Sequence, residues 1–306
     1  MVSLRELVKK EEKFIYGHRL CAGCGAGIIA RQVMLATETP VVVVCATGCL
    51  EVASTIFPYT AWKVPFLHVA FENAASVCSG IVAAYNSLMR QGKINKDIRF
   101  IAFGGDGGTY DIGLQALSGA MERGHHMLYI CYNNEAYMNT GIQRSSATPQ
   151  AAHTTTEPVG EVKYGKVRRR KNLTEILVAH EIPYVAQTVV GFWNDLIVKV
   201  QKALSVDGPA FINILQPCQL GWGYPKELTI EVGKLAAETC LWPIYEVENG
   251  KYKINYKPKE KKPVSEYFKL QQRFRHLLQP QYQELLNEIQ RDVDMHWEKL
   301  LSLEKI

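Results

Sequence analysis

Long hydrophobic runs are missing from this sequence. Its most apolar stretches, such as residues 41–46, have the length of a β-strand and are far shorter than the roughly 20 residues that cross a bilayer. Residues 1–13 carry charged side chains where a secretory signal has an apolar core. We therefore expect no membrane segment and a cytoplasmic location.

The sequence also lacks internal repeats and a strong charge imbalance. Hydrophobic residues make up 47% and charged residues 21%, as in ordinary globular proteins, and the net charge is +5. Basic residues gather in two short runs, 163–171 and 257–262, without a helical basic stripe or interleaved aromatics. A nucleic-acid partner is therefore not expected. For 163–171 we expect a solvated loop, with a docking surface for an acidic protein as the alternative.

Cysteine, in contrast, is well represented. Eight cysteines in a chain without a secretory signal favour reduced thiols or metal ligands over disulfides.

Apolar strand-like runs alternate with segments of helical periodicity. This alternation predicts an α/β fold, with a mostly parallel open sheet and helices on both faces. The predicted strands are 41–45, 66–70, 99–103, 127–132, 184–189 and 210–215. The predicted helices between them are 27–36, 74–90, 112–123, 173–180 and 192–204.

The alternation ends after Pro217. We therefore predict a domain at 1–220 and a C-terminal extension at 221–306 that packs on the core or on another subunit. Within the extension, 245–256 predicts a hairpin turning at Asn249-Gly250, and 265–278 and 280–303 predict amphipathic helices. The segment 134–171 has little periodicity, and a loop of this length inside a domain is usually functional.

A glycine-rich turn follows the predicted strand 99–103. Gly105-Asp106-Gly107 lies between this strand and a helix predicted to begin near Ile112, so backbone amides and a helix N-terminus meet there. Asp106 supplies a hard oxygen of the kind Mg²⁺ prefers, and Asn134 follows the next strand. Gly-Asp-Gly alone also occurs in ordinary turns.

The spacing is more specific. Gly105-Asp106-Gly107 is followed after twenty-five residues by Asn133-Asn134, and each half follows a strand. This pattern is the thiamine diphosphate motif. Resemblance to that superfamily implies that Asp106 and the Asn134 side chain bind Mg²⁺, with the Ala136 carbonyl as third ligand.

Four cysteines are candidates for a metal centre. Cys21 and Cys24 flank Ala22-Gly23, while Cys49 and Cys218 follow predicted strands, at the sheet edge where Asp106 and Asn134 fall. Spacing alone does not select these four. The others have better alternative interpretations: Cys45, Cys78 and Cys131 as buried apolar residues, and Cys240 as part of the extension. Four thiolates suit either zinc or an iron-sulfur cluster.

These residues together resemble the beta subunits of 2-oxoacid:ferredoxin oxidoreductases, most closely those of the pyruvate enzymes. The matching stretches are residues 17–25, 46–51, 68–75, 135–141 and 216–218.

The resemblance implies that Cys21, Cys24, Cys49 and Cys218 hold one 4Fe-4S cluster beside thiamine diphosphate. It also implies that Gly48 and Cys49 border the cofactor, and that Asn139 and Thr140 lie near the reacting groups. The implied reaction converts pyruvate and coenzyme A to acetyl-CoA and CO₂, with electrons passing to ferredoxin.

The chain has length for only the diphosphate-binding half of such a site. The glutamate that activates the aminopyrimidine ring is therefore expected from a partner, among alpha, gamma and delta-type subunits that carry the pyrimidine-binding domain and further clusters. We interpret Glu51 and Glu72 as structural.

Three alternatives stay open. The substrate could be oxalate, 2-oxoisovalerate or 2-oxoglutarate. A non-oxidative decarboxylase or carboligase would have no use for the four cysteines. A zinc-stabilised assembly subunit would have no use for Gly105-Asp106-Gly107.

Overall fold

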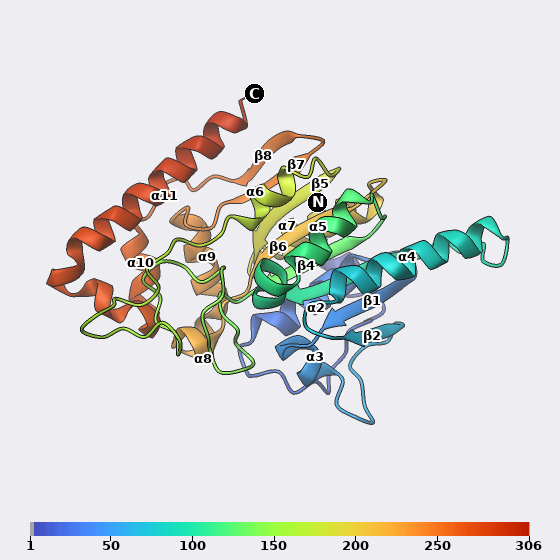
Figure 1. Cartoon of the computed structure of the whole chain (residues 1–306), viewed down its shortest axis with the longest axis horizontal. Helices are drawn as coiled ribbons and strands as arrows, with labels where there is room; N and C mark the ends of the chain where they lie inside the picture. The colour runs from blue at the N-terminus through green and yellow to red at the C-terminus, as the bar shows by residue number, and fades with distance from the viewer. Residues whose placement is uncertain (1–2, 306) are drawn as a thin grey trace.

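A single twisted sheet of eight strands forms the centre of the computed structural model, which describes residues 3–305 (Figure 1). The strand order is β2-β1-β3-β4-β6-β5-β7-β8; neighbours among β1 to β6 pair in parallel, and β7 and β8 are antiparallel. The strands are β1 (Val41–Ala46), β2 (Phe66–Val69), β3 (Arg99–Gly105), β4 (Leu128–Asn133), β5 (Tyr184–Val189), β6 (Ala210–Leu215), β7 (Ile244–Glu248) and β8 (Lys251–Tyr256). All six predicted strands and the mostly parallel sheet are confirmed.

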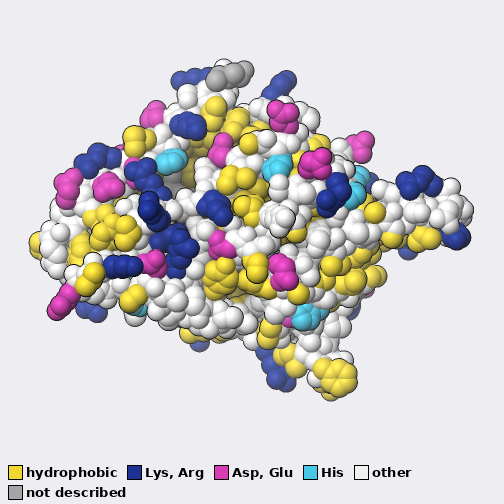
Figure 2. All heavy atoms as spheres, viewed as in Figure 1, with side chains coloured by type: hydrophobic (Ala, Val, Ile, Leu, Met, Phe, Trp, Pro, Cys, Tyr) yellow, Lys and Arg dark blue, Asp and Glu magenta, His cyan; other side chains and the backbone are white. Residues whose placement is uncertain are grey.

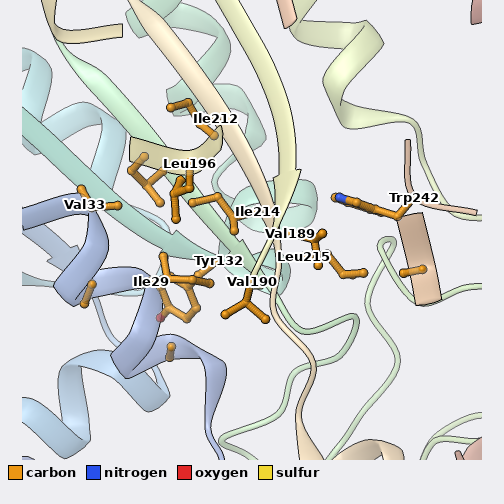
Figure 3. Packing of buried hydrophobic residues seen from close by; sticks show 14 of the residues in the cluster. Ile29, Val33, Tyr132, Val189, Val190, Leu196, Ile212, Ile214, Leu215 and Trp242 are labelled. Carbon is orange, nitrogen blue, oxygen red and sulfur yellow. The ribbon is translucent and has the colours of Figure 1, made fainter. Parts of the chain in front are cut away.

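Helices cover both faces of the sheet because the central strands are apolar on both sides. In β4, Leu128 and Ile130 pack into the core that contains α2, α7 and α9, while Tyr129 and Cys131 pack into the core that contains α4, α5 and α6. Figure 3 shows residues of α2 and α7 against β6. The helices are α1 (Leu4–Leu7), α2 (Gly25–Ala36), α3 (Cys49–Ser54), α4 (Ala74–Arg90), α5 (Leu114–Glu122), α6 (Leu173–Val178), α7 (Trp193–Ser205), α8 (Gln219–Trp222), α9 (Thr229–Glu238), α10 (Val264–Lys269) and α11 (Gln283–Leu303).

The C-terminal extension continues the sheet. The predicted hairpin is confirmed as β7 and β8, and β7 pairs with β5. Trp222, Tyr224 and Val232 belong to the same hydrophobic core as α2 and α7. Residues 1, 2 and 306, at the outer limits of the two predicted domains, lie outside the described residues.

One predicted helix of the extension is wrong. Residues 265–278 form α10 followed by the 3-10 helix η3 (Gln272–Leu278), because Gln271 between them is extended. The Gln271 side chain donates to the Tyr267 carbonyl at 2.9 Å, and the Arg273 side chain donates to the buried carboxylate of Glu135. The helix predicted at 280–303 is confirmed, with a 3-10 turn, η4 (Pro280–Tyr282), before α11.

The basic loop 163–171 is not simply solvated, so that prediction is wrong in part. Lys166 is buried, and its ammonium group donates to the carbonyls of Ser145, Ser146 and Thr148. Arg170 is half-buried and pairs with Glu135, whereas Lys163 and Arg168 are exposed. Figure 2 shows Lys and Arg side chains gathered in the left half of the view, where α11 lies. Within residues 3–305, no helix combines the length and apolar character needed to cross a membrane.

Candidate functional site

Four neighbouring strands bring the predicted residues to one edge of the sheet. The order β1-β3-β4-β6 places the segments after these strands next to one another at their carboxyl ends. Cys49 follows β1, Asp106 follows β3, Asn134 follows β4 and Cys218 follows β6.

Asp106 lies at the start of an unusual helical turn. The helix predicted near Ile112 begins earlier, as the π-helix η1 (Gly107–Ile112), which leads into α5. The close packing of this turn explains its glycines, since a Cβ atom on Gly108 would lie 2.7 Å from the Phe71 carbonyl oxygen. π-Helical turns often occur at functional sites because they displace side chains from the regular helix.

The Asp106 carboxylate is buried and held on both oxygens. It accepts hydrogen bonds from Ser145 Oγ at 2.6 Å and from the Asn134 backbone N–H at 3.2 Å. Burial raises the pKa of Asp106 to about 7, although these two hydrogen bonds oppose the shift. A cation beside the carboxylate would restore its ionised form.

Asp106, the Asn134 amide and the Ala136 carbonyl meet where the sequence predicts a magnesium site. The end of the Asn134 amide that faces them lies 3.0 Å from Asp106 Oδ1 and 2.8 Å from the Ala136 carbonyl oxygen, and without a cation hydrogen bonding favours the nitrogen in this place. With the oxygen there, the amide nitrogen donates to Gln216 Oε1 at 3.3 Å. Oxygens that share a Mg²⁺ ion at its usual bond length of 2.0–2.1 Å are about 2.9 Å apart. With the amide turned over, its nitrogen would donate to both oxygens, so the oxygen-inward orientation is favourable only with a cation. The residues fit Mg²⁺ on this test.

A cavity of about 210 Å³ opens beside these oxygens. The Tyr132 hydroxyl at its wall is buried without a hydrogen-bond partner, and a Cβ atom on Gly48 would lie 2.8 Å from it. The lining includes all the predicted cofactor-binding and catalytic positions: Gly48, Cys49, Gly105, Asp106, Gly107, Asn134, Asn139 and Thr140.

The four predicted cluster ligands lie close enough to affect one another. Cys24 precedes the first residue of α2, Cys49 begins α3, and Cys218 precedes α8. Burial, together with negative charge on Cys218, Cys24 and Cys21, raises the pKa of Cys49 to about 12. Within 3–305, no three His, Cys, Asp or Glu side chains are grouped as ligands of a single ion. Cys45, Cys78 and Cys131 are buried in their elements, as predicted.

Gln216 connects the two parts of the site, and its role was missed in the sequence. Its amide oxygen accepts from Asn134, and its amide nitrogen lies 3.6 Å from Cys24 Sγ. On the other side, the Cys49 thiol lies 3.7 Å from Asn139 Oδ1. The only signal in the sequence was the position of Gln216 two residues before Cys218.

A larger cavity, of about 600 Å³, lies between the basic loop, α6 and α11. Its lining contains none of the predicted site residues. We place the candidate site at the smaller cavity, because Asp106, Asn134, Ala136 and Cys49 line it.

Comparison with known proteins shows the family of the chain. Residues 46–214 match the model of the thiamine pyrophosphate enzyme C-terminal TPP-binding domain. The pyruvate synthase subunit PorB of Methanocaldococcus jannaschii is 57% identical over 88% of this chain and 91% of its own length. PorB of Thermotoga maritima is 51% identical over 99% and 95%. The chain belongs to the PorB family of thiamine diphosphate enzymes.

Two further proteins are similar to this chain. The ketoisovalerate oxidoreductase subunit VorB of Pyrococcus abyssi is 43% identical over 97% of this chain and 94% of its own length. The solved 2-oxoglutarate:ferredoxin oxidoreductase from Magnetococcus marinus superposes with a TM-score of 0.56 at 23% identity, over 68% of this chain and 66% of its own. The similarity to this solved structure supports the fold.

Proposed function

We propose that this chain is the cofactor-binding subunit of a pyruvate:ferredoxin oxidoreductase. The enzyme would convert pyruvate and coenzyme A to acetyl-CoA and CO₂ and pass two electrons to ferredoxin. The observation that carries the proposal is that Asp106, Asn134, Ala136 and Cys49 line one cavity at the carboxyl edge of the sheet. The family membership supports it.

The residues of this chain have separate tasks in the proposed site. Thiamine diphosphate, when bound, supplies the nucleophile and the electron sink for decarboxylation. Asp106 offsets the charge of Mg²⁺, and the backbone amides at Gly107 and Gly108 bind phosphate oxygens. Asn139 and Thr140, at the wall of the cavity, orient the substrate.

Cys21, Cys24, Cys49 and Cys218 would hold one 4Fe-4S cluster. Such a cluster accepts electrons singly, which suits the transfer of two electrons to ferredoxin. Cys49 lies in the lining of the cavity, so the electron path to such a cluster would be short.

A partner subunit would complete the site. Among the described residues that line the small cavity, Asp106 is the only carboxylate, and it is assigned to Mg²⁺. Glu51 accepts a hydrogen bond from Thr55 and lies 3.3 Å from His68, outside that lining. The glutamate that activates the aminopyrimidine ring is therefore assigned to the alpha-type subunit, with gamma and delta-type subunits relaying electrons.

Anaerobic purification tests the proposal. The chain should be brown, contain iron and sulfide, and lose visible absorbance on reduction. Colourless protein that contains zinc would favour an assembly subunit. Iron-free protein that binds thiamine diphosphate would favour a non-oxidative decarboxylase or carboligase.

The VorB likeness supports a second candidate substrate, 2-oxoisovalerate. Pyruvate is preferred because the two PorB relatives are more similar to this chain. Parallel assays of the complex with pyruvate, 2-oxoisovalerate, 2-oxoglutarate and oxalate would separate the candidates by kcat/KM.

A further inference from the structure

Glu135 occupies an unusual position between two proposed magnesium ligands, Asn134 and Ala136. It is fully buried, and its backbone φ of 63° lies in the left-handed region that favours glycine. A buried carboxylate is costly unless it is paired, and this backbone conformation is also unfavourable. Contacts with other residues must therefore stabilise both.

Two arginines from distant parts of the chain supply those contacts. Arg170 of the basic loop donates to Glu135 Oε1 at 2.8 Å, and Arg273 of η3 donates to Oε2 at 2.6 Å. Each carboxylate oxygen thus has its own guanidinium partner. Removal of one member of such a buried pair leaves an uncompensated charge.

Arg273 is itself held in place by the extension. Its guanidinium carbon lies 3.8 Å from the centre of the Trp222 ring, and its Nε donates to Gln271 Oε1 at 2.9 Å. Trp222 also makes a separate contact, because its Nε1 donates to the Asn134 carbonyl oxygen at 2.8 Å. The extension therefore contacts residues 134 and 135 through both Trp222 and Arg273.

We propose that Arg273 is a positioning residue for the magnesium site. Through Glu135, with Trp222 on Asn134, it fixes the backbone that presents the Asn134 amide oxygen and the Ala136 carbonyl to the ion. This inference rests on the proposed function, since it assumes that Mg²⁺ and thiamine diphosphate bind at Asp106. It assigns a task to the C-terminal extension that the Gly-Asp-Gly motif does not include.

Replacement of Mg²⁺ by Mn²⁺ allows a direct test on the full chain. Free Mn²⁺, measured by electron paramagnetic resonance in the presence of thiamine diphosphate, reports metal affinity independently of turnover. Arg273→Gln should weaken Mn²⁺ binding about 10–100-fold, as for other groups that orient metal ligands. Arg273→Lys should recover part of this loss, because it restores the charge beside Glu135 but not the planar stacking on Trp222.

Two controls come from the same 3-10 helix. Arg275 is exposed, so Arg275→Gln should leave Mn²⁺ affinity unchanged. Leu277 is fully buried, so Leu277→Ala should lower the melting temperature without weakening Mn²⁺ binding. If affinity instead fell in proportion to stability in both Leu277→Ala and Arg273→Gln, a merely structural role would replace the proposal.

If the Arg273→Gln variant does not fold, the Trp222→Phe variant provides the test. It keeps an aromatic ring under Arg273 but removes the hydrogen bond to the Asn134 carbonyl, so a smaller loss of affinity is expected. Unchanged Mn²⁺ affinity in a folded Arg273→Gln variant, or in Trp222→Phe, would overturn this inference but not the proposed function. Failure of the wild-type chain to bind Mn²⁺ with thiamine diphosphate would instead overturn the proposed function.

Discussion

At the residue scale, complete burial makes the ionised Asp106 carboxylate unfavourable without a ligand. Its pKa of about 7 means that the metal-free folded chain keeps the proton to higher pH than the unfolded chain, which releases it near pH 4. Stability without metal should therefore decrease as pH rises from 4 to 7, and in this range a bound cation should favour the ionised form.

Asp106→Asn tests this account. Asparagine resembles the protonated carboxyl. In the presence of a chelator, the free energy of unfolding of the variant should therefore increase relative to that of the wild type as pH rises toward 8. The gain should approach about 4 kcal/mol at most, since one pKa unit corresponds to about 1.4 kcal/mol. Urea unfolding at several pH values measures the difference. A difference that does not change with pH would mean that the carboxylate is already ionised without metal.

The same substitution should abolish the Mg²⁺-dependent binding of thiamine diphosphate, because no other acidic side chain lines the described part of the cavity. Asn134→Ala should weaken binding less, since a neutral oxygen attracts a cation less than a carboxylate does. Calorimetric titration with both variants compares them. Wild-type affinity in Asp106→Asn would remove the magnesium assignment.

The cysteines give a second prediction at this scale. Cys49→Ala or Cys218→Ala should remove one ligand and bleach the brown colour, because three thiolates cannot close a four-iron cage. Cys78→Ala and Cys131→Ala, which alter buried thiols in α4 and β4, serve as matched controls and should keep full iron. Full iron and sulfide in Cys49→Ala would show that the ligand set is wrong.

At the scale of elements, the turn from β3 into η1 determines how closely the chain can approach a diphosphate. A Cβ atom on Gly107 would lie 2.7 Å from the Tyr137 ring, so Gly107→Ala must displace that ring or the turn. We expect cofactor affinity to fall at least roughly tenfold, the scale typical of disturbed supporting groups. A Cβ atom on Gly80 in α4 would meet nothing within 4 Å, so Gly80→Ala should keep affinity and stabilise the chain by about 0.5–1 kcal/mol. Equal affinities in the two variants would contradict the account.

Elements differ in how far the sequence predicts them. The strands were predictable because β1 and β4 are short apolar runs between polar turns, and Asp106 and Asn134 follow their strands at a fixed spacing. The π-helical turn was not predictable from the sequence, since it depends on the packing of Gly108 against Phe71. The contacts of Glu135 with Arg170 and Arg273 were also hidden, because they join residues 35 and 138 positions apart. The same long-range pairing explains why 163–171 is partly buried.

At the scale of the whole molecule, the extension adds β7 and β8 to the sheet, and its Arg273 contacts Glu135 in the segment that we propose to bind the metal. Among the described residues that line the cavity at the edge formed by β1, β3, β4 and β6, the only carboxylate is Asp106, which the proposal assigns to Mg²⁺. We therefore expect that the isolated chain, loaded with cluster, Mg²⁺ and thiamine diphosphate, neither decarboxylates pyruvate nor reduces ferredoxin. Addition of the alpha-type subunit should restore turnover with coenzyme A, and loss of that subunit's glutamate should abolish it.

The most direct test of the central claim, that this chain holds the cofactor and its first electron acceptor at one edge of the sheet, is an anaerobic pyruvate titration of the assembled complex. Visible absorbance of the cluster should decrease on addition of pyruvate and coenzyme A with the wild-type chain. With Asp106→Ala the cluster should be present but should not respond to pyruvate, while dithionite should still reduce it. A pyruvate-dependent decrease of the same size in the Asp106→Ala complex would contradict the claim.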